Sequence, residues 1–214
     1  TQGFHHRPGP LEGVLVPEIW IALAESSGID ELLLTTRDIP DYDELMRRRL
    51  EILRANDLGL PAIQAASEAI VPLDGAMDFL AWLRDRFQVI ILSDTYYEIV
   101  QPLMRHLGWP TIFCHRLQVD GAGRVTGYIL RRKDHKTAAV RALHTLNFGV
   151  LAAGDSYNDT GMLGEADAGF LFDAPDSVTA DFPQFTPVNG YAALQEALLG
   201  AAAAMDAKGS APAS

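Results

Sequence analysis

The spacing of apolar positions changes along the chain near Val71. Between Pro17 and Val71, apolar residues recur at helical intervals, and no strand-like alternation is visible. This pattern predicts three helices, over 18–28, 41–55 and 62–70. Residues 17–71 are therefore predicted to form an all-helical unit.

After Val71, short apolar runs typical of buried strands alternate with helical patterns. The predicted strands are 88–92, 110–114, a hairpin of 117–120 with 124–130, 150–153 and 168–172, and the predicted helices are 76–87, 96–107, 133–146 and 191–205. This alternation indicates an α/β fold, a doubly wound, Rossmann-like parallel sheet with helices on both faces. The expected organisation is a core from 10–16 and 72–205, the helical unit 17–71 inserted after the first strand motif, and irregular termini at 1–9 and 206–214.

Composition narrows the classes of partner. The chain of 214 residues has 17 Lys and Arg against 28 Asp and Glu, a formal net charge of −11. This balance disfavours nucleic acid or an anionic membrane surface, whereas one locally basic pocket could still take a small anion. The single cysteine, Cys114, lies in an apolar run, which indicates a buried side chain and a reducing compartment. We therefore expect a cytoplasmic protein without nucleic-acid or membrane partners, and the sequence does not indicate an oligomeric state.

The stretch 148–163 carries the densest chemistry. Its apolar run ends at Gly154 and is followed by Asp155, Asn158 and Asp159. A carboxylate directly after a buried parallel strand lies at the sheet edge where such folds bind ligands, and oxygen ligands of this kind suit Mg²⁺. Asp and Asn are equally common as helix caps. Taken alone, this stretch fits a metal site and a helix cap equally well.

Other polar residues are expected at the same edge. Glu12, Ser93 and Asp155 each follow an apolar run, and Lys136 opens the helix before the last of these strands. A hydroxyl, a lysine and carboxylates together can hold a phosphate and stabilise the charge that develops in phosphoryl transfer. The simpler alternatives are a helix cap for Ser93 and a solvated surface charge for Lys136. Their joint occurrence at strand ends favours a site.

These motifs together resemble a known family. They are 11–18 (LEGVLVPE), 91–95 (ILSDT), Lys136, and 154–159 (GDSYND). In this order they are similar to the haloacid dehalogenase-like phosphotransferases, among them the phosphoserine phosphatases, and most of all the bifunctional phosphoserine phosphatase/homoserine phosphotransferases. The resemblance runs from about Leu11 to Leu198. It implies a helical cap at 17–71 and a role in serine biosynthesis.

The resemblance also implies an activity and a role for each site residue. The activity is Mg²⁺-dependent hydrolysis of O-phospho-L-serine through an aspartyl-phosphate, with homoserine as a further phosphoryl acceptor. The implied catalytic residues are Glu12 as general acid and base, Ser93 and Lys136; the substrate-binding residues are Glu18 for the amino group, Arg49 for the carboxylate, Ser93, Asp94, Lys136 and Asn158; the metal residues are Glu12, Asp155 and, in support, Asp159. Glu18 as a helix-end acid and Arg49 as one of three solvated arginines are the simpler readings.

The chain departs from the family at the nucleophile. The attacking Asp of the family aligns with Pro10, whose side chain cannot attack phosphorus, and residues 1–9 lack the apolar run expected of the first strand. The loss is one contiguous block while Glu12, Ser93 and Lys136 are kept. We therefore expect an altered N-terminal sequence rather than an evolved non-enzyme. As written, the chain is predicted to be catalytically impaired, and a non-catalytic homologue that binds a phospho-amino acid or an anion is the alternative.

Overall fold

Helices form between residues 17 and 71 at the three places that the sequence predicts. The computed structural model describes residues 11–35, 38–39 and 41–209, so the predictions for 1–9, Pro10 and 210–214 lie outside the described residues. The helices of the segment are α1 (Ile19–Ser27), the 3-10 helix η1 (Asp30–Leu33), α2 (Tyr42–Ala55) and α3 (Leu60–Glu68). Gly28 ends α1 in the left-handed conformation, with φ 70°. Asp41 caps α2 by accepting the Glu44 N–H at 2.9 Å.

The strands confirm the predicted α/β class. They are β1 (Ile90–Tyr96), β2 (Thr111–Val119), β3 (Val125–Ile129), β4 (Leu151–Gly154), β5 (Ala168–Phe172) and β6 (Thr186–Val188). β1 and β2 pair in parallel, β4, β5 and β6 are all parallel, and β3 runs antiparallel to β2. Within the described residues the ladders form two three-stranded sheets, β1-β2-β3 and β4-β5-β6, rather than one continuous sheet.

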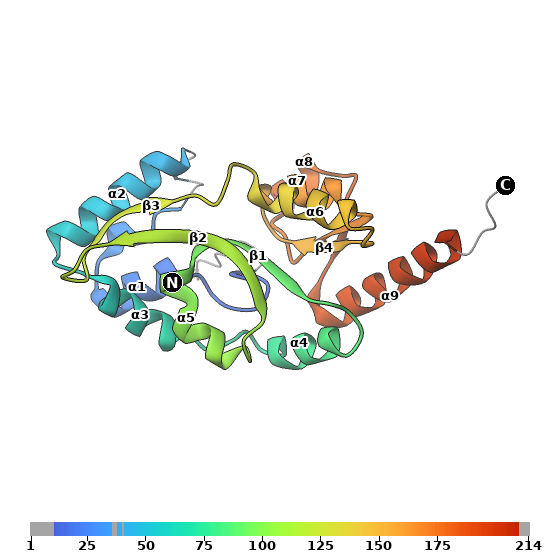
Figure 1. Cartoon of the computed structure of the whole chain (residues 1–214), viewed down its shortest axis with the longest axis horizontal. Helices are drawn as coiled ribbons and strands as arrows, with labels where there is room; N and C mark the ends of the chain where they lie inside the picture. Colours follow the sequence, from blue (N-terminus) through green and yellow to red (C-terminus); the bar gives the residue numbers. More distant parts are fainter. Residues whose placement is uncertain (1–10, 36–37, 40, 210–214) are drawn as a thin grey trace.

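Helices cover both faces of these strands (Figure 1). They are α4 (Ala76–Arg84), α5 (Tyr97–His106), α6 (His135–Thr145), α7 (Thr160–Glu165), α8 (Asp176–Asp181) and α9 (Gly190–Gly209). Strand β5 shows the two-sided burial directly. Phe170 and Phe172 belong to the large apolar cluster that contains Leu194 of α9, whereas Leu171 belongs to a second cluster with Val140 of α6. This alternation is what a strand buried on both sides requires.

Several boundaries differ from the prediction. The strand predicted at 110–114 and the first arm of the hairpin are one long strand, β2, and α8 and β6 were not predicted. The C-terminal segment predicted to be irregular from 206 is helical to Gly209, because the Ala-rich sequence continues α9. Although α9 is 20 residues long, no helix in the described part of the chain is long and apolar enough to cross a membrane.

The β2–β3 hairpin joins the helical segment to the rest of the molecule, and Figure 1 shows it lying along α2. At the hairpin turn, the Leu60 N–H of α3 donates to the Gly123 carbonyl at 2.8 Å. Farther along, the hydroxyls of Tyr42 in α2 and Tyr96 in β1 lie 2.6 Å apart. The Tyr128 hydroxyl of β3 donates to the Asp43 carboxylate. These contacts hold α2 beside the carboxyl end of β1 and α3 against the hairpin turn.

A substitution at Gly154 can test how tightly the end of β4 is packed. A Cβ added there would lie 2.5 Å from Cβ of Asp159, whose carboxylate is held by hydrogen bonds and cannot move away freely. We expect Gly154→Ala to lower the free energy of unfolding by about 1–3 kcal/mol, as overpacking does. Urea unfolding measures this. Gly121→Ala is the control, because a Cβ there meets nothing within 4 Å. Equal stabilities for the two variants would contradict the packing described.

Candidate active site

The site lies where β1 and β4 end. Regular pairing of β1 with β2 reaches Leu92 opposite Phe113 and resumes only at Tyr96 opposite His115, with a register shift between them. Asp94 lies within this irregular stretch, and bulges of this kind redirect side chains near binding sites. β4 ends at Gly154, and the next residue, Asp155, is fully buried. The two strand ends therefore carry the acidic residues predicted for the edge.

Asp159 organises the turn after β4. Its Oδ2 accepts the N–H groups of Asp155 and Ser156 at 3.1 and 3.2 Å and the Ser156 hydroxyl at 3.0 Å. Its Oδ1 accepts from Lys136 Nζ at 3.0 Å. Asp159 is fully buried. Both carboxylate oxygens thus accept hydrogen bonds, so Asp159 does cap the turn, as the alternative interpretation predicted. Because its oxygens are already engaged, Asp159 is better suited to supporting the other residues of a metal site than to binding the metal directly.

Lys136 is buried between two carboxylates. Only 3% of the residue is exposed, and Nζ lies 3.0 Å from Asp159 Oδ1 and 2.7 Å from Asp94 Oδ2. Burial alone would lower the pKa of Lys136, but the charges of Asp159 and Asp94 outweigh it and raise that pKa above its ordinary value. The simpler reading of Lys136 as a solvated surface charge is wrong. A buried ammonium of this kind suits phosphate binding.

Glu12 is set up to carry a proton. Burial, together with the charge of Glu18, raises the pKa of Glu12 to about 8, although Arg49 and a hydrogen bond with the Thr95 side chain oppose the shift. A general acid must be protonated at the working pH, and a carboxyl group with this pKa is protonated at neutrality. Glu12 lies in the turn Leu11–Val16, whose apolar side chains are buried.

Arg49 projects from α2 into the interior rather than into solvent. It is 6% exposed, its guanidinium lies 4.5 Å from the ring centre of Trp20, and one Nη donates to the Leu34 carbonyl at 2.9 Å. Burial lowers the pKa of Arg49, against the charges of Glu18 and others. Its Nε has no hydrogen-bond partner among the described residues. A buried donor without a partner is costly, so this one points to a ligand that is an acceptor.

The structure gathers most, but not all, of the predicted residues. Ser93 is buried, and its Oγ accepts the Thr95 N–H at 3.3 Å within β1, so it is not the cap of α5. Asn158 is exposed in the 3-10 helix η2 (Tyr157–Asp159), and among the described residues Lys136 pairs with Asp94 and Asp159 rather than with Asn158.

The predicted metal residues do not themselves form a compact ligand set. In the described part of the chain, the group of three metal-ligating side chains with ligand atoms within 4.8 Å of one another is Asp94, His115 and His135. Asp155 nevertheless fits the chemistry of Mg²⁺, because it places a buried carboxylate at the strand end.

Sequence reasoning missed His115 and His135. Both are buried, at 4% and 5% exposure, and both rings approach Asp94. Twenty residues separate them, and His115 lies in a strand while His135 begins a helix. No motif links them, and only the contact between β2 and the start of α6 brings them together.

The α/β fold and the buried ionisable residues at this edge are typical of an enzyme, and comparison with known proteins identifies the class as a family of hydrolases. A family model described as haloacid dehalogenase-like hydrolase matches residues 17–164. The chain belongs to this family and is a hydrolase of the haloacid dehalogenase-like type.

Curated relatives refine this assignment. A phosphoserine phosphatase of Pseudomonas syringae pv. tomato is 59% identical over 186 residues, covering 87% of this chain and 78% of the relative. The phosphoserine phosphatase ThrH of Pseudomonas aeruginosa is 58% identical over 189 residues, covering 88% and 92%. The phosphoserine phosphatases are therefore the group that this chain resembles, as the motifs predicted.

Solved structures agree on the fold. A substrate-bound phosphoserine phosphatase matches with a TM-score of 0.70 at 20% identity, covering 91% of this chain and 98% of the other. A phospho-aspartyl intermediate analogue of a phosphoserine phosphatase matches with a TM-score of 0.64 at 20% identity, covering 82% and 91%. At such identities the match concerns the arrangement of helices and strands alone.

The raised pKa of Glu12 predicts a pH-dependent effect on stability. Between the unfolded pKa near 4.5 and the folded value of about 8, the native state keeps a proton that the unfolded chain has lost. Stability therefore falls as the pH rises through this window. Glu12→Gln removes the ionisable group. The free energy of unfolding of the variant, relative to that of the unsubstituted chain, should therefore increase from pH 5 to pH 8 by an amount on the order of 1–3 kcal/mol.

Urea unfolding in metal-free buffer at both pH values measures the gain. Glu25→Gln is the control, because it makes the same substitution at an exposed glutamate of α1, outside the turn that carries Glu12. A constant difference between Glu12→Gln and the unsubstituted chain would show that Glu12 ionises normally.

Proposed function

We propose that this chain binds O-phospho-L-serine and carries the site for Mg²⁺-dependent hydrolysis of that ester, with homoserine as a second phosphoryl acceptor. The observation that carries the proposal is Arg49, a buried guanidinium with an unpartnered Nε beside the charge of Glu18. An amino acid offers a carboxylate to Arg49 and an ammonium group to Glu18. A phosphorylated sugar or simple alkyl phosphate offers neither.

The helical segment 17–71 would act as a cap that recognises the amino-acid end. Guanidinium binds carboxylate with two parallel hydrogen bonds, and Trp20 stacked on Arg49 restrains the plane from which they are donated. Glu18 is buried at the start of α1, where an ammonium could pair with it. The division into a cap at 17–71 and a core at 10–16 and 72–205 is part of this proposal.

The core would hold the phosphate. Lys136 and the Ser93 hydroxyl would donate to phosphate oxygens, and Asn158 would reach them from the rim. Protonated Glu12 would give its proton to the serine oxygen as the ester bond breaks, then take one from the attacking water or acceptor hydroxyl. Asp155 and the Glu12 carbonyl would hold Mg²⁺, which when bound neutralises phosphate charge.

The reaction also needs a nucleophile. In the family an aspartate forms an aspartyl-phosphate, and here Pro10 stands at that position, outside the described residues. Pro10 is the specific observation that favours a second candidate function, a homologue that binds a phospho-amino acid or an anion without turning it over. The two candidates share the pocket and differ only in the attacking group.

Restoring the nucleophile separates the two candidates. A variant with Pro10→Asp and an apolar strand in place of residues 1–9 should release phosphate from O-phospho-L-serine with Mg²⁺, at least 100-fold faster than the unaltered chain, since covalent catalysis would be regained. A colorimetric phosphate assay measures this. The same apolar strand with Pro10 retained is the control and should remain inactive. An inert restored variant on all small phosphomonoesters would refute the hydrolase proposal.

Arg49 can be tested in the chain as it stands. Arg49→Ala should weaken the binding of O-phospho-L-serine about 10- to 100-fold, by loss of a charge-assisted bidentate contact. It should leave phosphoethanolamine, which lacks the carboxylate, nearly unaffected. Isothermal titration calorimetry measures both ligands, and Arg48→Ala is the matched control because Arg48 is the exposed neighbour on α2. Equal losses for the two ligands would contradict the assignment.

A further inference from the structure

Asp94 is the point on which a cluster of donors converges. Its Oδ2 lies 2.7 Å from Lys136 Nζ, and its Oδ1 lies 3.0 Å from Nε2 of His135 and 3.7 Å from Nε2 of His115. Burial alone would raise the pKa of Asp94, but Lys136 and the two histidines hold it well below its ordinary value. Asp94 therefore remains a carboxylate, fixed through both of its oxygens.

The hydrogen bonds of His115 show which nitrogen carries its proton. The backbone N–H of Arg131 donates to Nδ1 of His115 at 3.2 Å. Arg131 is itself anchored, because its Nε donates to the Cys114 carbonyl and one Nη to the Tyr97 hydroxyl. A ring nitrogen that accepts a hydrogen bond has no proton, so the neutral ring carries its proton on Nε2, facing Asp94.

This arrangement is the reverse of a metal site. Histidines that ligate metals use one nitrogen as ligand and donate the N–H of the other. In His115 the nitrogen away from Asp94 is the acceptor, so the nitrogen near Asp94 has no lone pair to offer. The cluster Asp94, His115 and His135 has the spacing of a metal site, with ligand atoms within 4.8 Å. Its geometry instead gives the carboxylate one hydrogen bond, from His135 at 3.0 Å, and a second N–H that faces it, from His115 at 3.7 Å.

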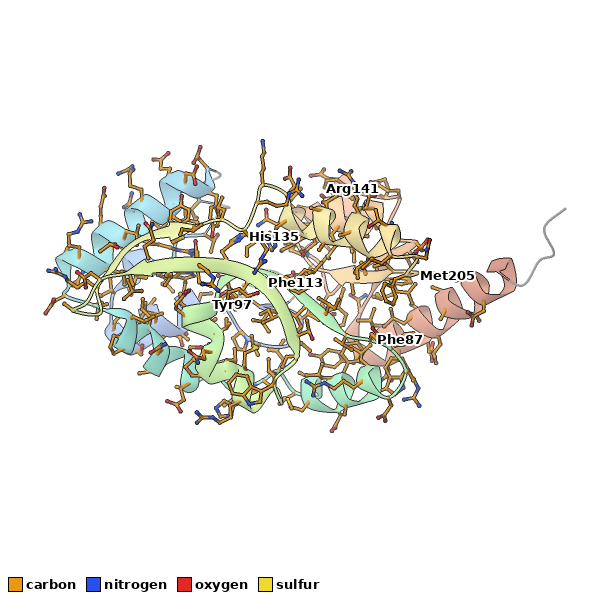
Figure 2. The ribbon with its side chains drawn as sticks, viewed as in Figure 1. Phe87, Tyr97, Phe113, His135, Arg141 and Met205 are labelled. Atoms are coloured by element: carbon orange, nitrogen blue, oxygen red, sulfur yellow. The ribbon has the colours of Figure 1, made fainter. Side chains whose placement is uncertain are left out.

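The His135 side chain makes its hydrogen bond with Asp94 through one ring nitrogen. It is 5% exposed, its Nε2 meets Asp94, and its Nδ1 has no partner among the described residues. Burying an imidazole is unfavourable unless it makes hydrogen bonds. His135 also directly precedes Lys136 at the start of α6, and Figure 2 shows it where the connection from β3 enters that helix, well away from Arg141 farther along.

We propose that His135, supported by His115, is a positioning residue that acts on Lys136 through Asp94. The N–H of His135 holds Oδ1 and the N–H of His115 faces the same oxygen, which leaves Oδ2 to fix the ammonium. An ammonium has three donors, and Asp159 and Asp94 accept two of them. The third is then aimed at the pocket, where it would meet a phosphate oxygen. This proposal rests on the phosphate pocket of the proposed function.

A double-mutant cycle tests the coupling, with inorganic phosphate as the probe and calorimetry as the measurement. His135→Leu should weaken phosphate binding about five- to tenfold, because Asp94 loses its fixed orientation, whereas in an Asp94→Ala background it should change binding less than twofold. His135→Gln keeps a side-chain N–H donor and should recover most of the affinity. His144→Leu is the control, since His144 lies on the same helix paired with Asp167 at 3.1 Å. A His135→Leu effect that persists without Asp94 would overturn the proposal.

Nuclear magnetic resonance on the unsubstituted chain tests the geometry without phosphate and without any substitution that could impair folding. ¹⁵N shifts should show His115 and His135 both protonated on Nε2, and Zn²⁺ should leave these signals unmoved. A proton on Nδ1 of either ring, or Zn²⁺ binding at the pair, would overturn the positioning role. Absence of phosphate binding by the unsubstituted chain, with both tautomers as stated, would count against the proposed function and leave the His135–Asp94 interaction established.

Discussion

Lys136 held between Asp159 and Asp94 is the interaction on which the site depends. The ammonium is almost completely buried, and burying a charge is tolerated only when it is paired and hydrogen-bonded. Removing one partner from a buried pair typically costs about 3–5 kcal/mol. Because Asp94 belongs to β1, Lys136 to α6 and Asp159 to the turn after β4, this pairing also links the two sheets.

The same interaction ties the turn after β4 to the pocket. Asp159 accepts backbone N–H groups with one oxygen and Lys136 with the other, so the capping role and the electrostatic role use opposite sides of one carboxylate. Gly154 leaves the room that this carboxylate needs. Helix cap and functional residue were alternatives in the sequence, and in the structure they are compatible.

The helical segment supplies a second charged region. Arg49 and Glu18 are buried there, and Glu12 lies close enough for their charges to shift its pKa. Raising the pKa of Glu12 requires that water be excluded, and the contact of Tyr42 with Tyr96 keeps α2 beside the end of β1. The raised pKa of Glu12 thus depends on the packing of the residues around it.

The sequence by itself determined most of the order of helices and strands, though not α8 and β6, together with the α/β class, the family and the residue types at the strand ends. These follow from local periodicity and from short motifs such as 91–95 and 154–159, which carry their information in adjacent positions. Only the tertiary structure decided which residues are partners. His115 and His135 meet Asp94 because β1 bulges, β2 runs beside it and α6 begins at the same edge. Such contacts join residues far apart in the chain, and no local pattern records them.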